Sequence, residues 1–521
     1  MTFKFDNSYA HLPERFFAHQ NPVPVRAPRL VRVNARLAAL LGVEPAITTD
    51  HPSAEVAARL AAIFAGNTVP EGAEPIAAVY AGHQFGQWVP RLGDGRAVLL
   101  GEVIGRDGIR RDIQLKGAGR TPFSRGGDGR AALGPVLREY IVSEAMAALG
   151  IPSTRALAAV LTGEEVLREV PLPGAILTRV ARSHVRIGTF QYFAANGDTE
   201  AVRVLVDYVI RHLYPDAAHA AAPVRAMLDH VIAAQAKLVA QWMSVGFIHG
   251  VMNTDNMSIA GETIDFGPCA FMDGFNPAAV FSAIDEMGRY AWGYQPTITH
   301  WNLARFCQTL LPLLSENGRD AQESAQEALD AFPVLFETAW LGIMRAKLGF
   351  AEVLTSAGIE SETGAADRSL VKDLLKIMTN HGRDDSGADF TLTFRWLSEL
   401  AINVGDEEAQ AAETRFMGLF AEQEPVTSWL ARWRQRLSQA EGPMPGGDNM
   451  RQERMRAINP TIIPRNHLIQ EAISAALEED FAPFDALVDA LANPFVSQSA
   501  NAYFMAPPRP EQVVTQTFCG T

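Results

Sequence analysis

The chain has 521 residues, of which 48% are hydrophobic and 20% are charged, and its formal net charge at pH 7 is −14. A chain of this length and composition can bury a large core divided over two or three lobes. The negative charge argues against a protein that binds duplex nucleic acid, because such proteins need a basic face to neutralise phosphates.

The cysteines and the first residues indicate where the protein works. Cys269, Cys307 and Cys519 are too few and too scattered for a disulfide framework or a zinc site, and they favour a reducing compartment. The opening MTFKFDNSYAHLPERFF contains acids and lacks an apolar signal core. No apolar run approaches the roughly 20 residues needed to span a bilayer. We therefore predict a cytoplasmic protein without a membrane or nucleic-acid partner.

The N-terminal part of the chain divides into an extension and a strand-rich lobe. Residues 1–75 are punctuated by prolines and contain one or two short helices, such as 53–66. For residues 76–188, the pattern of apolar residues predicts one helix among several strands. The order of strands, one helix and then strands is typical of the small lobe of a protein kinase. We expect the helix at 131–150 and strands at 97–104, 112–117, 154–162, 164–170 and 174–181.

The segment GAGRTPFSRGGDGRAALG, residues 117–134, is rich in glycine and arginine and directly follows Lys116. Glycines let backbone amides approach a phosphate closely, and a helix beginning near Ala131 would add its positive end. Between Arg91 and Arg186, fifteen Lys and Arg stand against ten Asp and Glu, a local surplus of positive charge in an acidic chain. These features favour a site for a small polyanion, with a flexible surface loop as the alternative.

Lys116 ends a predicted strand, and Glu139 lies in the helix that follows. Protein kinases pair a phosphate-binding strand lysine with a helix glutamate in this arrangement. A strand lysine and a helix glutamate can also occur together by chance, and Glu144 on the same helix is an alternative partner. The pattern nevertheless predicts an ion pair between Lys116 and Glu139.

Arg179 and Arg186 lie in GAILTRVARSHVRIG, at the place of the last small-lobe strand and the hinge of a kinase. A kinase offers apolar walls and backbone groups to adenine there. Guanidinium groups suit phosphate oxygens better, because they bind them with bidentate hydrogen bonds. The two arginines therefore predict phosphate where a kinase holds adenine. The alternative is a pair of surface arginines bonded to Glu164, Glu165 or Glu169.

The second half of the chain is predominantly helical. Apolar residues recur at helical spacing within 221–247 and predict a long core helix. Further helices complete a large lobe over residues 189–440. The stretch EGPMPGGDN, residues 441–449, is typical of a linker. It opens a C-terminal helical extension, residues 441–521, that ends in a cysteine-containing tail.

The long helix leads into HGVMNTDNMSIAGETIDFG, residues 249–267. A protein kinase has H-R-D-x-x-x-x-N and then D-F-G, where the first Asp accepts the substrate proton and the Asn and second Asp hold Mg²⁺. Counted back from Asn256, the proton-accepting position is Val251, and an acid stands at Asp255 instead. Asn256 and Asp265 are accordingly candidate ligands of a hard cation.

Asp265 follows a turn and is expected at the end of a short apolar strand, where a kinase presents its metal-binding Asp. D-F-G alone is a weak signal, and a turn with a capping aspartate is the alternative. His249 is expected to be structural rather than catalytic.

These motifs together resemble one family, over nearly the whole chain. They include FDNSYAHLPERFF, YAGHQFGQWVPRLGDGRAVLLGE, DIQLKGAGRTPFSRGGDGRA, LREYIVSEAM, HGVMNTDNMSI, IDFGPCAFMD and NPTIIPRNHLIQEAI. The chain is similar to the SelO/YdiU proteins, which are protein nucleotidyltransferases with a kinase-like fold. The resemblance implies that ATP binds inverted relative to kinases, so that the α-phosphate faces the acceptor and AMP passes to a protein hydroxyl.

Carried over by position, the resemblance also implies a role for each residue of the site. Asp255 would be the general base, Asn256 and Asp265 the metal ligands, and Glu139 the partner of Lys116. The nucleotide would be bound by Gly93, Gly95, Arg96, Lys116, Asp128, Gly129, Arg179 and Arg186.

The predicted fold is α+β and protein-kinase-like, with a strand-rich small lobe, a helical large lobe and extensions at both ends. We expect the protein to transfer AMP from ATP to Ser, Thr or Tyr hydroxyls of acceptor proteins, with Mg²⁺ or Mn²⁺. Self-modification and UMP transfer from UTP are also open. A phosphoryl-transferring kinase and a catalytically silent nucleotide-binding scaffold are the alternatives. A further hypothesis is that oxidation joins Cys269 to Cys519 and clamps the catalytic loop.

Overall fold

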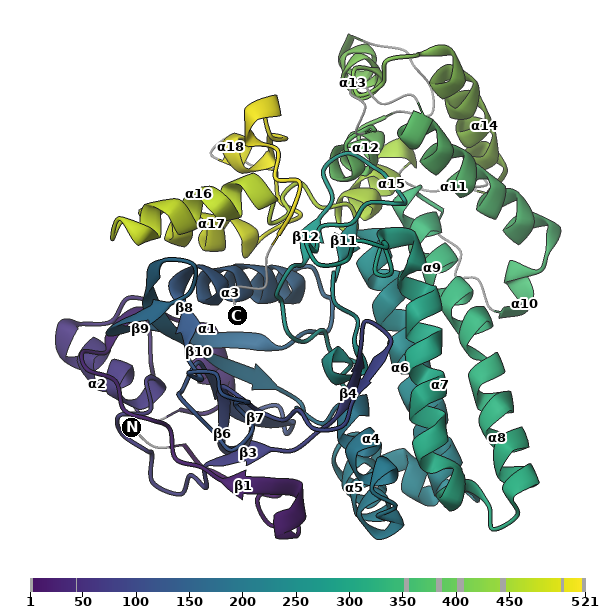
Figure 1. Ribbon diagram of the computed structural model, residues 1–521. Coiled ribbons are helices and arrows are strands. Elements are labelled where there is room, and N and C mark those ends of the chain that lie inside the picture. The colour runs from purple at the N-terminus through teal and green to yellow at the C-terminus, as the bar shows by residue number, and fades with distance from the viewer. Residues whose placement is uncertain are drawn as a thin grey trace.

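An antiparallel sheet organises the N-terminal part of the molecule (Figure 1). The computed structural model describes residues 3–43, 45–350, 356–380, 387–400, 407–440, 447–497 and 501–517. The eight-stranded sheet has the order β1-β3-β6-β7-β10-β9-β2, with β8 paired to β10. Its strands are β1 (Phe17–His19), β2 (Arg29–Val33), β3 (Ile76–Ala78), β6 (Ala97–Ile104), β7 (Arg110–Lys116), β8 (Ala131–Ala132), β9 (Arg155–Leu167) and β10 (Pro171–Ala181).

The sheet is covered by helices on both faces. Val98 and Ile113 pack on one face with α1 (Ala35–Leu40) and α2 (Ala54–Phe64), whereas Leu177 packs on the other with α3 (Leu133–Ala148). Because both faces are buried, β6 is an almost continuous apolar run rather than an alternating one. Such runs are easy to recognise, and the predicted strand 97–104 has the same bounds as β6.

One prediction about this sheet is wrong, and one feature of it was not predicted. The separate strands expected at 154–162 and 164–170 are the single strand β9, because Gly163 adopts a left-handed φ of 70° and the strand continues through it. The N-terminal extension, residues 1–75, supplies both edge strands of the sheet, β1 and β2, which the sequence did not indicate. These strands have three and five residues, too few to show a period in the sequence.

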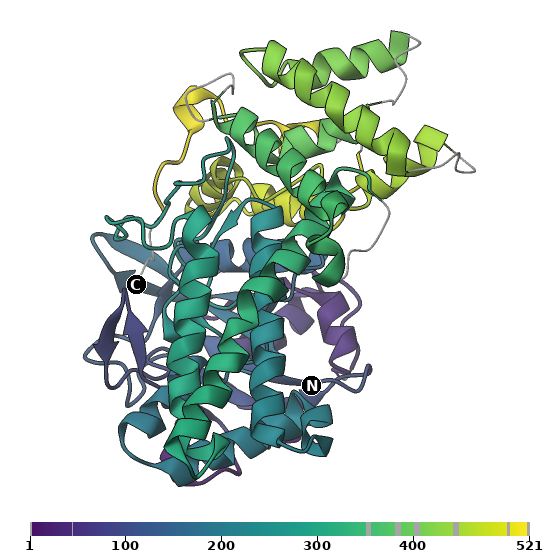
Figure 2. The same ribbon diagram turned by 90° about the vertical axis from the view of Figure 1, so that its right-hand side faces the viewer.

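The remainder of the described chain is mainly helical (Figures 1 and 2). The predicted core helix is α6 (Pro223–Ser244), which packs against α7 (Gln295–Leu314) and α9 (Phe332–Lys347). Figure 2 shows the long helices of this part side by side. The others are α4 (Ile187–Ala195), α5 (Thr199–His212), α8 (Gly318–Asp330), α10 (Ser356–Ile359), α11 (Glu362–Asn380), α12 (Phe390–Leu397), α13 (Glu407–Met417), α14 (Glu424–Ala440), α15 (Gly447–Arg456), α16 (Asn466–Leu477), α17 (Ala482–Leu491) and α18 (Ala502–Met505).

Two small hairpins complete the architecture. β4 (Gly82–Gln84) pairs with β5 (Gln87–Val89), and β11 (Phe247–Ile248) pairs with β12 (Ala270–Phe271). Residues 441–446 of the predicted linker lie outside the described residues, and α15 begins at Gly447. None of the helices within the described ranges has the length and apolar character needed to cross a membrane.

The C-terminal extension supports α3 from the side away from the sheet (Figure 1). Helices α16 and α17 both contact α3, and the rings of Phe484 and Tyr140 meet edge to face at 5.5 Å. The buried guanidinium of Arg32 in β2 bonds Asp485 and Asp489 of α17 as well as Asp50. The first and last parts of the chain are therefore joined behind the helix that carries Glu139.

We predict that Arg32→Met destabilises this junction. Removing the cation leaves Asp50, Asp485 and Asp489 without the guanidinium that they share, a loss of about 2 kcal/mol. The melting temperature should fall and amide hydrogen exchange in α17 should accelerate. Arg29→Ala on the same strand is the control, because Arg29 is exposed and its nearest acid, Glu479, lies at 3.7 Å. Equal effects of the two substitutions would contradict the prediction.

Candidate active site

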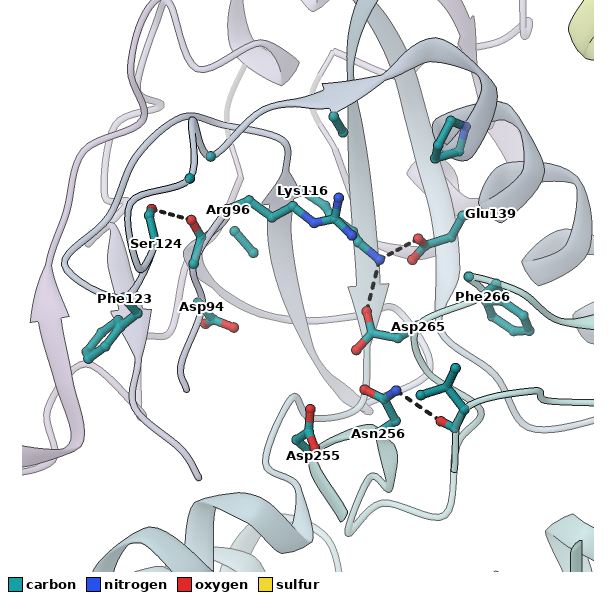
Figure 3. Close-up of a pocket in the computed structure, with 18 of the residues that line it drawn as sticks. Asp94, Arg96, Lys116, Phe123, Ser124, Glu139, Asp255, Asn256, Asp265 and Phe266 are labelled. Carbon is teal, nitrogen blue, oxygen red and sulfur yellow. Dashed lines mark hydrogen bonds and ion pairs between the residues drawn. The ribbon is translucent and has the colours of Figure 1, made fainter. Parts of the chain in front are cut away.

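A cleft with a volume of about 510 Å³ opens between the sheet and the helical part (Figure 3). It brings together segments that are far apart in the sequence, from the loops of the sheet to the motif at 249–267. Every residue that the sequence predicted for the site lines this cleft: Gly93, Gly95, Arg96, Lys116, Asp128, Gly129, Arg179, Arg186, Asp255, Asn256 and Asp265.

Asp265 is the centre of an ion-pair network in this cleft. Its Oδ1 accepts hydrogen bonds from Lys116 Nζ at 2.9 Å and Arg179 Nη1 at 2.6 Å, and its Oδ2 accepts one from Arg186 Nη1 at 3.0 Å. Lys116 Nζ also bonds Glu139 at 2.6 Å, as predicted (Figure 3). Burial alone would raise the pKa of Asp265, but the three cations hold it well below its usual range. The carboxylate is therefore ionised.

The alternative partner of Lys116, Glu144, is engaged elsewhere. Its carboxylate bonds the guanidinium of Arg155 at 2.7 and 2.8 Å and accepts from Asn34 at 2.7 Å. Residues five apart on an α-helix point about 140° away from each other. Glu139 and Glu144 thus serve opposite sides of α3, and the prediction of Glu144 as an alternative partner is wrong.

The two predicted arginines are buried, with exposed fractions of 2% each. Arg179, on β10, also bonds Gln114 and Glu139. Arg186, at the start of α4, donates to the backbone carbonyl of Asp255 at 2.7 Å and stacks over the ring of Tyr80. They are not surface residues paired with Glu164, Glu165 or Glu169, so that alternative is wrong. This wall of the cleft is cationic.

Asp255 lies in a 3-10 turn, Thr254–Asn256, directly beside this network. Burial raises its pKa to about 6, while a hydrogen bond from Gln84 and the charge of Arg186 oppose the rise. Gln84 Nε2 donates to Oδ2 at 3.1 Å, whereas the buried Oδ1 has no hydrogen-bond partner among the described residues. One carboxylate oxygen is thus fixed, and the other is left to accept a proton.

The segment before Asp265 differs from the prediction. No strand forms there; Thr263 makes only an isolated bridge to Ser153, because Phe247–Ile248 pairs with Ala270–Phe271 instead. His249 is buried, and its Nε2 lies 2.9 Å from the carbonyl oxygen of Ile264. The imidazole holds the loop together, in keeping with the structural role expected for it.

Glycines allow two loops to meet at the cleft. Gly93 has a φ of 105°, and a Cβ there would lie 2.5 Å from the ring of Phe123. Gly129 has a φ of 69°, and its Cβ would lie 2.1 Å from the carbonyl oxygen of Gly119. A side chain at either position would push the backbone apart. The glycines therefore allow the two loops to pack closely where they line the cleft.

Asp128 and Arg96 have different partners. Asp128 is exposed, and its carboxylate bonds Arg168 at 2.8 Å and the backbone N–H of Arg130 at 2.9 Å, so it fixes the loop that contains it. The guanidinium of Arg96 has no ion-pair partner within the described ranges. It is available to a ligand in the cleft.

The side chains present fit a hard cation bound together with phosphates. Asn256 Nδ2 donates to the carbonyl of Val251 at 3.0 Å, which leaves the amide oxygen for another contact. This oxygen and the Asp265 carboxylate are the donor types that Mg²⁺ prefers, and Mg²⁺ usually takes one or two carboxylates plus substrate phosphates. No group of three or more His, Cys, Asp or Glu that could hold a metal occurs among the described residues. The site thus resembles one that needs the nucleotide to complete it.

Two residues of the cleft were not singled out by the sequence. Arg138 is only 7% exposed, its Nη1 has no hydrogen-bond partner, and it has no ion pair within the part of the chain described here. In the sequence it was one arginine among several. Gln84 contacts Asp255, which lies 171 residues later in the sequence, and no local sequence pattern predicts such a contact.

The proposed pairing of Cys269 with Cys519 remains open. Cys269 is buried three residues after Phe266, whereas Cys519 lies outside the described residues.

Comparison with known proteins decides the family. A family model described as "Protein adenylyltransferase SelO" matches residues 1–492. The chain belongs to the SelO family. Relatives named protein nucleotidyltransferase YdiU, from Rhodopseudomonas palustris strains HaA2 and BisB5 and from Rhizobium etli, are 55%, 56% and 55% identical to it. The alignments cover 100% of this chain and 99%, 99% and 97% of the relatives. The motif resemblance is thereby confirmed over the whole length.

We predict that Asp265→Asn weakens the fold of this SelO-family protein and makes it depend on anions. Asn retains the shape and tolerates the left-handed φ of 62° at this position, whereas Ala would add backbone strain. Without the charge, Lys116 and Arg179 keep only Glu139 and Arg186 loses its ion pair, at a cost of about 3 kcal/mol. The melting temperature should fall, and pyrophosphate should raise it more in the variant than in the wild type. An unchanged melting temperature would contradict this view of the network.

Proposed function

We propose that this protein transfers AMP from ATP to Ser, Thr or Tyr hydroxyls of acceptor proteins, on a protein-kinase-like bilobal fold. The observation that carries the proposal is that the buried guanidinium groups of Arg179 and Arg186 line the cleft and bond Asp265, in the segment where a kinase-like order of elements would offer apolar walls to adenine. Membership of the SelO family supports nucleotidyl transfer as the reaction class. The pairing of a sheet lysine with Glu139 and the placement of Asn256 and Asp265 support the kinase-like arrangement.

The charge of the cleft matches a triphosphate. The lining of the cleft carries eight cations against five carboxylates. The cations are Arg96, Lys116, Arg125, Arg130, Arg138, Arg168, Arg179 and Arg186, and the carboxylates are Asp94, Asp128, Glu139, Asp255 and Asp265. A polyanion offsets such a surplus, and buried guanidinium groups gain bonds to its oxygens. The nucleotide therefore enters with its terminal phosphates toward the arginines and its α-phosphate toward Asp255.

Asp255 then acts as the general base. The acceptor hydroxyl oxygen attacks the α-phosphorus, the bond from that phosphorus to the bridging oxygen of the β-phosphate breaks, and pyrophosphate leaves. The hydroxyl proton passes to the free carboxylate oxygen of Asp255. Asn256 and Asp265 would hold Mg²⁺ or Mn²⁺, whose charge, when bound, would neutralise the phosphates and the leaving group. Lys116 and the arginines stabilise the charge that develops on pyrophosphate.

Three other activities are distinguished by which label is transferred. UMP transfer from UTP is a second candidate, because the name of the relatives states nucleotidyl transfer without specifying adenine or uracil as the nucleobase. A phosphoryl-transferring kinase is disfavoured by Val251 at the usual base position. A silent scaffold is disfavoured by the free oxygen of Asp255, since a binding protein needs no base.

We predict that ATP labelled at the α-phosphate marks the protein or an added acceptor, whereas ATP labelled at the γ-phosphate does not. Mass spectrometry should find AMP on a Ser, Thr or Tyr side chain, and Asp255→Ala should abolish the mark without loss of fold. The same assay with UTP labelled at the α-phosphate measures the preference of the protein for adenine or uracil. Label from the γ position alone would establish a kinase, and no label from any nucleotide would favour the scaffold.

We also predict that Arg138→Ala weakens ATP binding by about tenfold or more, the value of one or two lost charge-assisted hydrogen bonds. Adenosine should bind as before. Because Arg138 makes no ion pair with a carboxylate among the described residues, the melting temperature should hold or rise. Arg203→Ala, which removes an exposed cation on α5, is the control. Equal losses for ATP and adenosine would show that Arg138 shapes the cleft and does not contact phosphate.

A further inference from the structure

The hairpin β4–β5 is an insertion that leaves the main sheet and reaches the helical part (Figure 1). It lies in the chain between β3 and β6, two neighbours in the sheet, but forms its own two-stranded sheet. β4 contacts α4 and the 3-10 turn that carries Asp255. An element of the sheet part thus touches the site of the proposed base from outside the ion-pair network.

Three consecutive residues of the hairpin bond three consecutive residues of this loop. The N–H of His83 donates to Thr254 Oγ1 at 2.7 Å, and the N–H of Phe85 donates to Asn253 Oδ1 at 3.0 Å. Between them, Gln84 Nε2 donates to Asp255 Oδ2 at 3.1 Å.

The backbone and a neighbouring residue hold this register. Phe85 has a φ of 51°, which is uncommon for a bulky residue and persists only where its surroundings impose it. The hydroxyl of Tyr290 donates to the same Asn253 oxygen at 2.7 Å. These contacts hold the hairpin against the loop, so that Gln84 stays within hydrogen-bond distance of the Asp255 carboxylate.

The hairpin also constrains the other side of the carboxylate. A Cβ on Gly82 would lie 2.6 Å from Asp255 Oδ1, so this oxygen rests against the bare backbone of the glycine. Oδ1 receives no hydrogen bond from the described residues. One face of the hairpin thus provides a donor for Oδ2 and a small, donor-free surface for Oδ1.

We propose that Gln84 is a positioning residue for the transfer reaction, and that Gly82 is required beside it. Gln84 fixes the rotation of the Asp255 carboxylate about its last bond by occupying Oδ2. The acceptor hydroxyl then meets a carboxylate of fixed orientation, whose other oxygen, Oδ1, has no competing donor among the described residues. This inference rests on the proposed function, since it assumes that Asp255 accepts the proton.

The test compares the two residues at the end of the hairpin. Gln84 and Gln87 are paired across the strands, but only Gln84 contacts Asp255, and Gln87 is exposed. Gln84→Ala should lower kcat for AMP transfer by about 10- to 100-fold, because a misplacement of about 1 Å can cost about 100-fold. The KM for ATP should stay within about twofold, since nucleotide binding depends on other residues. Gln87→Ala should leave both constants unchanged.

Two further variants approach the same carboxylate differently. Gln84→Glu keeps the size of the side chain but replaces the donor by a negative charge, so its kcat should fall at least as far as that of Gln84→Ala. Gly82→Ala should lower kcat by displacing Oδ1, with the melting temperature recorded to separate misfolding from misplacement.

The outcomes separate this inference from the proposed function. If the wild type is active and Asp255→Ala is inactive, normal kcat in both Gln84 variants overturns the inference alone. Parallel losses of kcat and ATP affinity in Gln84→Ala would also overturn it, by showing a structural role. If the wild type gives no α-label, the proposed function fails and the inference fails with it.

Discussion

The structure depends on one carboxylate shared by three cations. Asp265 belongs to the loop of the helical part, whereas Lys116 and Arg179 belong to neighbouring strands of the sheet and Arg186 to the start of α4. Buried cations so close together repel one another unless an anion lies between them. The same network thus holds the two parts of the molecule at a fixed separation and concentrates positive charge where a polyanion can bind.

The supports of this network come from both ends of the chain. α3 presents Glu139 to Lys116, and its other side is covered by α16 and α17, which Arg32 ties back to β2. The buried Arg465 bonds Asp273 and Asp389 and anchors the segment that follows the loop of Asp265. The extensions are therefore part of the scaffold of the site and cannot be regarded as appendages.

The sequence predicted the parts of the fold whose signal is local. β6 and α6 are long apolar elements, and the ion pair Lys116–Glu139 follows from a lysine at the end of a strand and a glutamate in the next helix. The single strand β9 was missed because a glycine between two apolar runs normally indicates a turn in a sequence. Gly163 instead has a left-handed φ within the strand. The edge strands β1 and β2 were missed because their stability comes from neighbours distant in the sequence.

The site shows the same division. Residue types suited to phosphate and metal could be recognised from composition and motif, and they line one cleft. Gln84 could not be recognised in this way, because it acts through a contact between the β4–β5 hairpin and a loop far along the chain. Arg138 could not be recognised either, because the lack of a hydrogen-bond partner for its Nη1 is visible only in the folded structure.

The packing of α16 and α17 on α3 also bears on how the protein is made. α3 emerges from the ribosome early, whereas the helices that cover its outer side are synthesised near the other end of the chain. Until then Tyr140 and its apolar neighbours on α3 remain uncovered, and Arg32 lacks its partners in α17. Domains generally fold as they are synthesised. The sheet and α3, however, cannot complete their packing before α16 and α17 have been synthesised. The outer side of α3 can therefore be covered only after synthesis has reached Leu491, the end of α17, so truncation of the C-terminal extension would expose apolar surface on the helix that carries Glu139.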